Sequence, residues 1–267
     1  MHLYEQLQRD TVADRNYLLA APAIQRALAG DITRELYVEF LTQAYHHVRH
    51  TVPLLMAVGA RLPERHEWLR EAVLHYLDEE KGHEQWILND IEHAGGDRQA
   101  AAASLPSIAT ECMVAYAYDT IQRRNPLGFF GMVFVLEGTS VALALNAADR
   151  IKSALQLPAK AFSYLRSHGE LDQQHVGDLE GILGRLTDEA DRAAVSRCQK
   201  GGLWCRGRWS TDLENNPTAK RNTAQATPSA RWTRRGPCPG SARIARLRTR
   251  AVLQRVENPG GLRGVKG

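Results

Sequence analysis

The sequence predicts an all-α protein, and three observations support this prediction. Apolar residues recur at three- and four-residue spacing through most of the first 197 positions, which is the period of a helix with one buried face. Proline and glycine gather at short breaks between these runs, such as AGD at 29–31 and HAGGD at 93–97. No segment alternates strictly between apolar and polar residues with flanking turn dipeptides, so no part of the pattern favours β-strands.

The predicted helices follow one another along the chain. Asp31 and Glu35 mark a helix start, and apolar residues at helical spacing then continue from Ile32 to Val48. Short segments that contain proline or glycine bound the later helices. We expect these over residues 64–93, 106–123, 127–153, 159–184 (with a kink at Gly169) and 186–197. Residues 1–197 are therefore expected to form one helical domain, a bundle of about seven helices.

Residues 198–267 differ from this domain in composition. Residues 199–267 contain 15 Lys and Arg against 3 Asp and Glu, so this part is near +12, and the remaining 19 basic and 27 acidic residues leave residues 1–198 near −8. We expect a basic tail of low order, and three interpretations stay open: a disordered tail, a nucleic-acid-binding arm, or translation of a shifted, GC-rich reading frame. Nucleic acid is the partner that we expect least.

The composition also limits the cellular setting. The longest apolar run falls short of the ~20 residues that cross a bilayer, and the polar N-terminus MHLYEQLQRDTVADR has no signal-peptide core. The four cysteines show neither a disulfide framework nor zinc-site spacing. We therefore expect a soluble, cytoplasmic protein without a membrane partner.

The segment HGELDQQH, residues 168–175, places two imidazoles and one carboxylate at offsets of zero, four and seven. A helix turns about 100° per residue, so His168, Asp172 and His175 fall within about 60° of one another. They form one stripe of nitrogen and oxygen atoms. Such a stripe is either a solvated polar face or a set of metal ligands.

Two other segments supply matching side chains. Glu80 and His83 are three residues apart and so share a helix face, although Glu79 and His83 form a competing pair. Glu137 is the lone carboxylate in FFGMVFVLEGTSVALAL, a run that must be buried on most sides. A buried carboxylate is costly unless a cation, a metal or a proton accompanies it. We therefore predict that Glu137 is a metal ligand and the central catalytic residue.

The six predicted ligands are too many for one ion that keeps an open position, and they suit two ions bridged by a carboxylate. Imidazole and carboxylate without thiolate favour iron, with manganese as the second choice. The predicted ligands are Glu80, His83, Glu137, His168, Asp172 and His175. We assign the first three mainly to one ion and the last three mainly to the other.

These three segments, in this order, resemble the motif of the haem-oxygenase-like di-iron oxidases and oxygenases, relatives of thiaminase-II and pyrroloquinoline-quinone synthase C. That motif is Glu-x-x-His, then a lone Glu on a later helix, then His-x-x-x-Asp-x-x-His. The resemblance covers about residues 1–197. It implies a seven-helix fold, two ferrous ions and dioxygen as co-substrate. It also implies a small organic substrate and an electron donor, and it is compatible with a homodimer.

Two other functions stay open at this stage. One is a metal-free enzyme of cofactor biosynthesis or hydrolysis, similar to thiaminase-II or pyrroloquinoline-quinone synthase C, in which histidines do acid–base work. The other is a non-enzymatic helical binding protein. For the substrate, we predict contacts from the segment AYHHVRHTVPLL, with Tyr45, His46 and His50 as the binding residues.

Overall fold

The computed structural model describes residues 2–215, and for residues 140–142, 170–174 and 214–215 it describes the backbone alone. This part of the chain is all-α, as predicted. Its helices are α1 (Leu3–Asp10), α2 (Val12–Leu19), α3 (Pro22–Ala29), α4 (Arg34–Val48), α5 (Thr51–Arg61), α6 (Glu67–Glu80), α7 (His83–His93), α8 (Arg98–Ala103), α9 (Ile108–Arg123), α10 (Phe129–Leu155), α11 (Ser163–Gly184) and α12 (Glu189–Asn215). Three 3₁₀ turns join them at Glu64–His66, Pro126–Gly128 and Ala159–Phe162.

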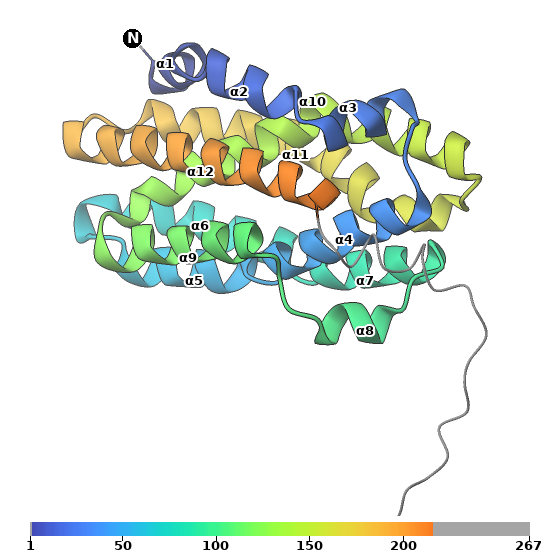
Figure 1. The fold of residues 1–267 in the computed structure, drawn as a ribbon. Coiled ribbons are helices and arrows are strands. Elements are labelled where there is room, and N and C mark those ends of the chain that lie inside the picture. The colour runs from blue at the N-terminus through green and yellow to red at the C-terminus, as the bar shows by residue number, and fades with distance from the viewer. Residues whose placement is uncertain (1, 216–267) are drawn as a thin grey trace, which may run out of the picture. The chain divides into compact units, whose positions relative to one another are not determined.

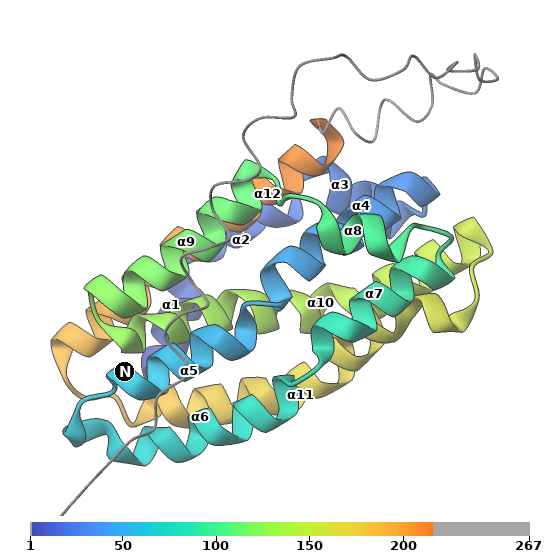
Figure 2. The ribbon, with the colours of Figure 1, turned by 90° about the horizontal axis from the view of Figure 1, so that it is seen from below.

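The long helix α10 organises the bundle. It packs along α11 and α12, while α4 packs on α7 and α5 packs on α6 and α9. Figure 1 shows α1, α2 and α3 running one after another above α12, with α8 at the opposite side of the bundle. Figure 2, seen from below, shows α6 and α7 following one another beside α11. This pairing of α6 and α7 with α11 brings two of the predicted ligand segments together.

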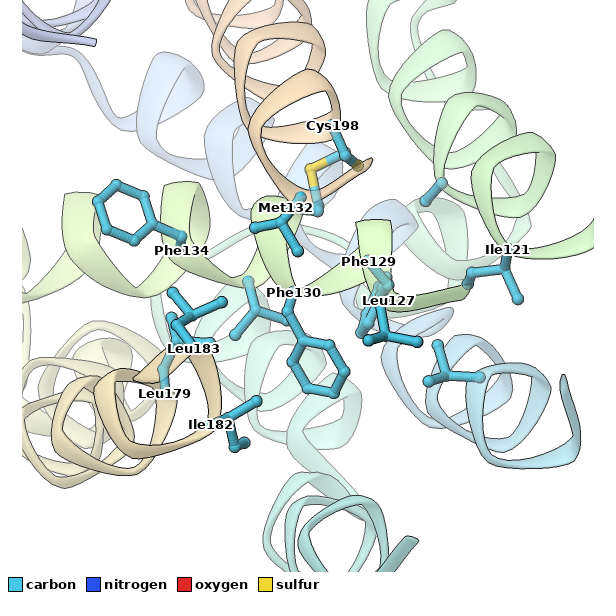
Figure 3. Packing of buried hydrophobic residues seen from close by; sticks show 14 of the residues in the cluster. Ile121, Leu127, Phe129, Phe130, Met132, Phe134, Leu179, Ile182, Leu183 and Cys198 are labelled. Atoms are coloured by element: carbon cyan, nitrogen blue, oxygen red, sulfur yellow. The ribbon is translucent and has the colours of Figure 1, made fainter. Parts of the chain in front are cut away.

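The hydrophobic core lies around α10. Phe130 is fully buried in a cluster to which α9, α11 and α12 contribute Ile121, Leu183 and Cys198 (Figure 3). Full burial of a side chain of this size stabilises the fold by about 1.5–3 kcal/mol. A second core joins α4, α7 and α11, and in it the buried Tyr37 hydroxyl donates to the carbonyl of Ala161 at 2.6 Å. The two cores hold α7, α10 and α11 in a fixed register.

The described residues form more helices than the seven expected, because several predicted helices are interrupted. The predicted helix over 64–93 is broken at Lys81 and Gly82, where Gly82 adopts a left-handed φ of +93°. The chain also bends between α4 and α5, at Arg49 and His50. The first long helix begins one residue after Thr33, whose side chain accepts a hydrogen bond from the Leu36 N–H.

The last helix corrects the expected domain boundary. We expected the helical domain to end at residue 197, but α12 continues to Asn215 and buries Leu203, Cys205, Trp209 and Leu213. The boundary therefore moves beyond Asn215, and residues 198–215 belong to the helical domain. Residues 216–267, the rest of the predicted tail, lie outside the described residues.

The start of α12 is fixed by a buried carboxylate. Asp191 accepts hydrogen bonds from His66 Nε2 at 2.7 Å, from Asn125 Nδ2 at 2.7 Å and from Arg65 at 3.1 Å. Burial raises the pKa of this carboxyl, but the three donors outweigh it and hold the pKa below its usual value. Close packing supports the same helix, because a Cβ at Gly131 would clash with the Val195 carbonyl oxygen.

Among the described residues, no single helix is long and apolar enough to cross a membrane. The bent pair Pro126–Thr139 and Leu143–Leu155 meets the criterion in length and composition alone. Apart from the 3₁₀ turn Pro126–Gly128, both segments belong to α10, which is a core helix of the bundle.

Candidate metal centre

Three of the predicted ligands meet at one point. Glu80, His83 and His168 each offer a ligand atom, and these atoms lie within 4.8 Å of one another. Glu80 is 8% exposed and His83 is 1% exposed. The three side chains come from the end of α6, the start of α7 and the first third of α11. Segments 85 residues apart in the sequence thus supply one group of nitrogen and oxygen atoms.

The break between α6 and α7 positions the first two of these residues. Glu80 is the last residue of α6 and His83 is the first residue of α7, so they do not share a continuous helix as predicted. The left-handed Gly82 turns the chain between them, a conformation that glycine adopts without the cost that a Cβ imposes. The pair still meets, with His83 Nδ1 3.1 Å from Glu80 Oε2.

The contact with Glu80 indicates which nitrogen of the His83 ring carries the proton. Because an ionised carboxylate only accepts hydrogen bonds, Nδ1 is the donor to Glu80. A neutral ring then carries a lone pair on Nε2, the form that a metal ligand requires. His83 Nε2 is buried, and it has no hydrogen-bond partner among the residues that the structure describes. A metal ion would satisfy this atom, so the group fits the ion that the sequence predicts.

The His168 ring contacts the rings of His83 and Tyr164. The two rings are nearly perpendicular, with centroids 4.9 Å apart, and the ring of Tyr164 lies 4.6 Å from that of His168. The register of α11 against α7 depends on Asp90, which is fully buried. Its carboxylate accepts hydrogen bonds from the N–H groups of Ser163 and Tyr164 and from the Ser163 hydroxyl, and it thereby caps the start of α11.

His175 forms a second group beside the first. Its Nε2 donates to Glu79 Oε2 at 2.9 Å, and its Nδ1 lies 3.6 Å from Glu137 Oε1. With the proton on Nε2, a neutral ring would direct a lone pair at the Glu137 carboxylate. Two acceptors at this distance are stable together when a cation or a second proton lies between them. His175 and Glu137 therefore form an arrangement that suits a second ion.

The structure changes the predicted division of ligands between the two ions. His168 groups with Glu80 and His83, and Glu137 groups with His175, whereas we had placed Glu137 with the first pair and His168 with His175. The reason is that α11 crosses the α6–α7 break, so its two histidines, two turns apart, face different neighbours. Asp172 lies between them on α11, and its side chain is outside the described residues.

An apolar cavity of about 110 Å³ opens beside these groups. Glu80, Glu137 and His168 line one side of it, and the rest is mostly apolar, including Leu55, Met113, Phe129 and Met132. A second cavity of about 110 Å³ lies between α3, α4, α10 and α12 and shares Tyr164, His168 and Arg206 with the first. Both candidate metal groups are thus reached from an interior space suited to an organic molecule.

The predicted substrate residues Tyr45, His46 and His50 lie away from both cavities. His46 Nε2 is 2.8 Å from the Ser104 hydroxyl, and His50 Nδ1 is 3.2 Å from the Tyr118 hydroxyl. The ring of Tyr45 instead packs beneath the Arg49 guanidinium, 5.5 Å away. Their role in substrate binding stays a prediction, and the two cavities described here do not support it.

His47 is the histidine of this segment that lines the first cavity, together with Val48 and Thr51. Burial, followed by the charges of Arg206 and His168, holds the pKa of His47 well below its usual value. Neighbouring residues on a helix point about 100° apart, so the composition of HHVRH could not indicate which histidine faces inward.

Four residues of the site were not found from the sequence: Glu79, Asp90, His47 and Arg206. The sequence offers Glu79 only as a rival partner for His83, and the place of Asp90 near the end of a predicted helix indicates a solvent-facing side chain. Their roles depend on contacts between α6, α7 and α11, which no local pattern reveals. Arg206 lies in the segment that we had assigned to the tail.

Solved structures with the same arrangement of helices identify the fold class. The chain is similar to a domain of unknown function with a haem-oxygenase-like fold from Shewanella denitrificans, at 24% identity and a TM-score of 0.73 over 87% of this chain and 99% of that one. It is similar to a TenA homologue from P. horikoshii, at 11% identity and a TM-score of 0.68 over 80% of this chain and 99% of that one. It is also similar to haem oxygenase-1 from Synechocystis in complex with haem, at 12% identity and a TM-score of 0.63 over 84% and 96%. The protein therefore has an all-α, haem-oxygenase-like fold.

The sequence identifies the family to which the chain belongs. The model of the iron-containing redox enzyme family matches residues 38–205, more than half of the sequence. The chain belongs to this family, as the motif resemblance predicted. No curated protein matches the chain significantly.

Proposed function

We propose that the protein is a non-haem di-iron oxidoreductase that uses dioxygen to oxidise a small organic substrate. One observation carries the proposal: the ligand atoms of Glu80, His83 and His168 lie within 4.8 Å of one another at the wall of an apolar cavity. Membership of an iron-containing redox family makes iron the first candidate for this group, and the nitrogen and oxygen ligand set also accepts manganese.

In this proposal the two groups hold one ion each. Glu80, His83 and His168 bind the first ion. Glu137 and His175 bind the second, while Glu79 holds the opposite nitrogen of the His175 ring and so fixes the direction in which Nδ1 points. Asp172 remains the sixth ligand that the sequence predicts, and its side chain lies outside the described residues. When bound, ferrous iron would supply the electrons that activate dioxygen, and an external electron donor would restore the reduced state.

The chain itself contributes the surroundings of the reaction. The apolar side chains of the cavity exclude bulk water, which would otherwise compete for the reacting groups. Tyr76 lines the same cavity and donates from its hydroxyl to the His175 carbonyl at 3.3 Å. Burial, and then the charges of Glu137 and Asp178, raise the pKa of Tyr76, so the phenol keeps its proton at neutral pH. Glu137 lines the cavity and its Oε1 lies 3.6 Å from His175 Nδ1, and we assign it the central catalytic role.

Anaerobic titration of the metal-free protein with Fe(II) tests the proposal. We expect two ions per chain, and on admission of oxygen an absorption band in the visible region. Replacement of His83 or Glu137 by alanine should remove one ion and abolish the band, whereas His93→Ala, an exposed histidine on the same helix α7, should change neither. Iron binding equal in all variants, or substrate turnover that survives chelation and exclusion of oxygen, would contradict the proposal.

The cysteines bear on the rival hydrolytic function. Thiolate attack requires a cysteine with a low pKa beside a substrate cavity. Of the described cysteines, Cys112 is exposed and lies outside both cavity linings, while burial raises the pKa of Cys198 to about 11 and also raises that of Cys205. These properties favour the metal-dependent function over the cysteine-dependent one.

Several expectations remain proposals. A homodimer is compatible with the fold, and light scattering would test it. A cytoplasmic location, the absence of a membrane partner and the absence of nucleic-acid binding are proposals of the same kind. The interpretation of residues 198–267 as a shifted reading frame stays a prediction, which the encoding DNA tests.

A further inference from the structure

A buried guanidinium lies beside the candidate metal centre. Arg206 Nη1, on α12, is buried and has no hydrogen-bond acceptor among the described residues. No described carboxylate forms an ion pair with it, and its guanidinium instead lies over the face of Trp209, 4.2 Å from the ring centroid. Burial lowers the pKa of Arg206. Arginine nevertheless stays protonated in proteins. A buried cation of this kind requires an anionic partner, which the described residues do not supply.

Two further nitrogen atoms close by share this property. His47 Nε2 and Trp209 Nε1 are buried, and neither has a hydrogen-bond partner within the described part of the chain. His47 is 8% exposed and Trp209 is 2% exposed. The rings of His47 and Trp209 are in edge-to-face contact, with centroids 6.4 Å apart. Trp209 lies on α12, the helix that also carries Arg206. A buried polar group without a partner loses its hydration with nothing in return, so each of these atoms favours a bound acceptor.

These three residues surround the junction of the two cavities. Arg206 lines both cavities, His47 lines the one with the candidate metal groups, and Trp209 lines the other. The rest of the second cavity is lined mostly by apolar side chains such as Leu36, Phe40 and Ile151. A fixed positive charge and two potential N–H donors therefore lie beside a mostly apolar space, and His168 lines both cavities.

We propose that Arg206, His47 and Trp209 bind the carboxylate of the substrate, and that the apolar body of the substrate occupies the second cavity. A guanidinium matches the two oxygens of a carboxylate, and a neutral His47 with its proton on Nε2 donates as well. Bound in this way, the carbon atoms next to the carboxylate lie beside His168. That the bound carboxylate is a substrate rests on the proposed function. That the site binds an apolar carboxylate does not depend on it.

Calorimetry on the metal-free protein tests the site without any contribution from iron. The probes are octanoate and octan-1-ol, which share an alkyl chain and differ in charge. We expect octanoate to bind at least tenfold more tightly than the alcohol. The Arg206→Gln protein should lose this preference, and Arg208→Gln, an exposed arginine on the same helix, should keep it. Equal binding of the two probes, or a preference that survives Arg206→Gln, would overturn the proposal.

A second variant tests where the apolar body lies. Ala147 lines the second cavity, so Ala147→Phe should weaken both octanoate and octan-1-ol about equally. Circular dichroism and a thermal melt check that each variant is folded. Unchanged binding of both probes to folded Ala147→Phe would rule out the second cavity as the binding site.

Iron titration of Arg206→Gln keeps this proposal separate from the proposed function. We expect this variant to bind iron as the unsubstituted protein does. Normal iron binding with a lost preference for octanoate supports both proposals. Selective octanoate binding by a protein that binds no iron would support the anion site and contradict the di-iron function.

Discussion

The Asp90 carboxylate on α7 accepts a hydrogen bond of 2.8 Å from the backbone N–H of Tyr164 on α11. Asp90 lies seven residues after His83, and Tyr164 lies four residues before His168. The contact therefore joins the two helices within two turns of the candidate metal ligands on each. It sets the register that places the His83 and His168 rings 4.9 Å apart.

Replacement of Asp90 by alanine should therefore damage stability and metal binding together. The variant loses three buried hydrogen bonds, and we expect unfolding to become easier by about 2–4 kcal/mol. Urea denaturation and Fe(II) titration measure the two effects. Asp97→Ala is the matched control, because Asp97 also caps a helix, accepting from the Gln99 and Ala100 N–H groups of α8. Its loss should cost about 1 kcal/mol and leave iron binding unchanged.

The left-handed glycine between α6 and α7 gives a second prediction. A Cβ at Gly82 would meet no atom within 4 Å, so Gly82→Ala is opposed by its φ of +93° alone. We expect a loss of about 1–2 kcal/mol in stability, or a shift of His83 that weakens iron binding. Gly181→Ala, in the regular part of α11 and with equal free space, should instead stabilise the protein by about 0.5–1 kcal/mol. A Gly82→Ala protein as stable as the Gly181→Ala protein would contradict this account.

Glu79 should matter through the orientation of His175. Its carboxylate accepts a hydrogen bond from His175 Nε2. Replacement of a carboxylate that orients a metal-binding histidine typically weakens metal affinity by about 10–100-fold. We expect Glu79→Gln to weaken one of the two iron-binding steps by that order. Glu71→Gln, an exposed carboxylate on the same helix, should have no effect on either step. Calorimetric titration resolves the two steps, and a Glu79→Gln protein in which both steps are unchanged would speak against this role.

Buried His47 predicts how stability depends on pH. Its folded pKa lies below the unfolded value of about 6.5, so below that pH the unfolded chain binds more protons than the folded protein. The contribution of neutral His47 is thus complete above about pH 6.5 and is lost progressively as the pH falls. The free energy of unfolding of metal-free protein should decrease less from pH 7.5 to 5 in His47→Gln than without the substitution. An equal decrease in both would contradict the prediction.

The cysteines should differ in reactivity. In the folded protein at pH 8, a thiol reagent should label the exposed Cys112 first. Cys198, whose pKa burial raises to about 11, should react only after unfolding. Peptide mapping by mass spectrometry distinguishes these sites, and rapid labelling of Cys198 in folded protein would show that its surroundings differ from those described here.

The helical class and most helix positions follow from local periodicity, because an amphipathic helix carries its own signal. The predicted last helix ended at residue 197 because the composition changes there, to a basic segment rich in Arg, Gly, Pro, Ser and Thr. The glycines within α12 do not interrupt the helix. They serve close packing instead: a Cβ at Gly201 would clash with the Tyr116 ring, and one at Gly202 would crowd Met132. Tertiary contact, not intrinsic propensity, stabilises this segment as a helix.

The candidate site was predictable only in part. The spacing of Glu80 and His83 and the isolation of Glu137 identified residues that do line one cavity or meet at one point. The sequence could not show that Glu79 meets His175, because that contact joins positions 96 residues apart. Nor could it separate His47 from His46, since the choice depends on how α4 is rotated in the bundle.

The place of α12 in the sequence has a consequence for how the interior space is completed during synthesis. Chains emerge from the ribosome N-terminus first, and Arg206 and Trp209 belong to the last described helix. The helices that carry the candidate metal ligands are therefore made before the wall that closes the second cavity. The second cavity is therefore complete only once α12, the last of these helices to be synthesised, has docked.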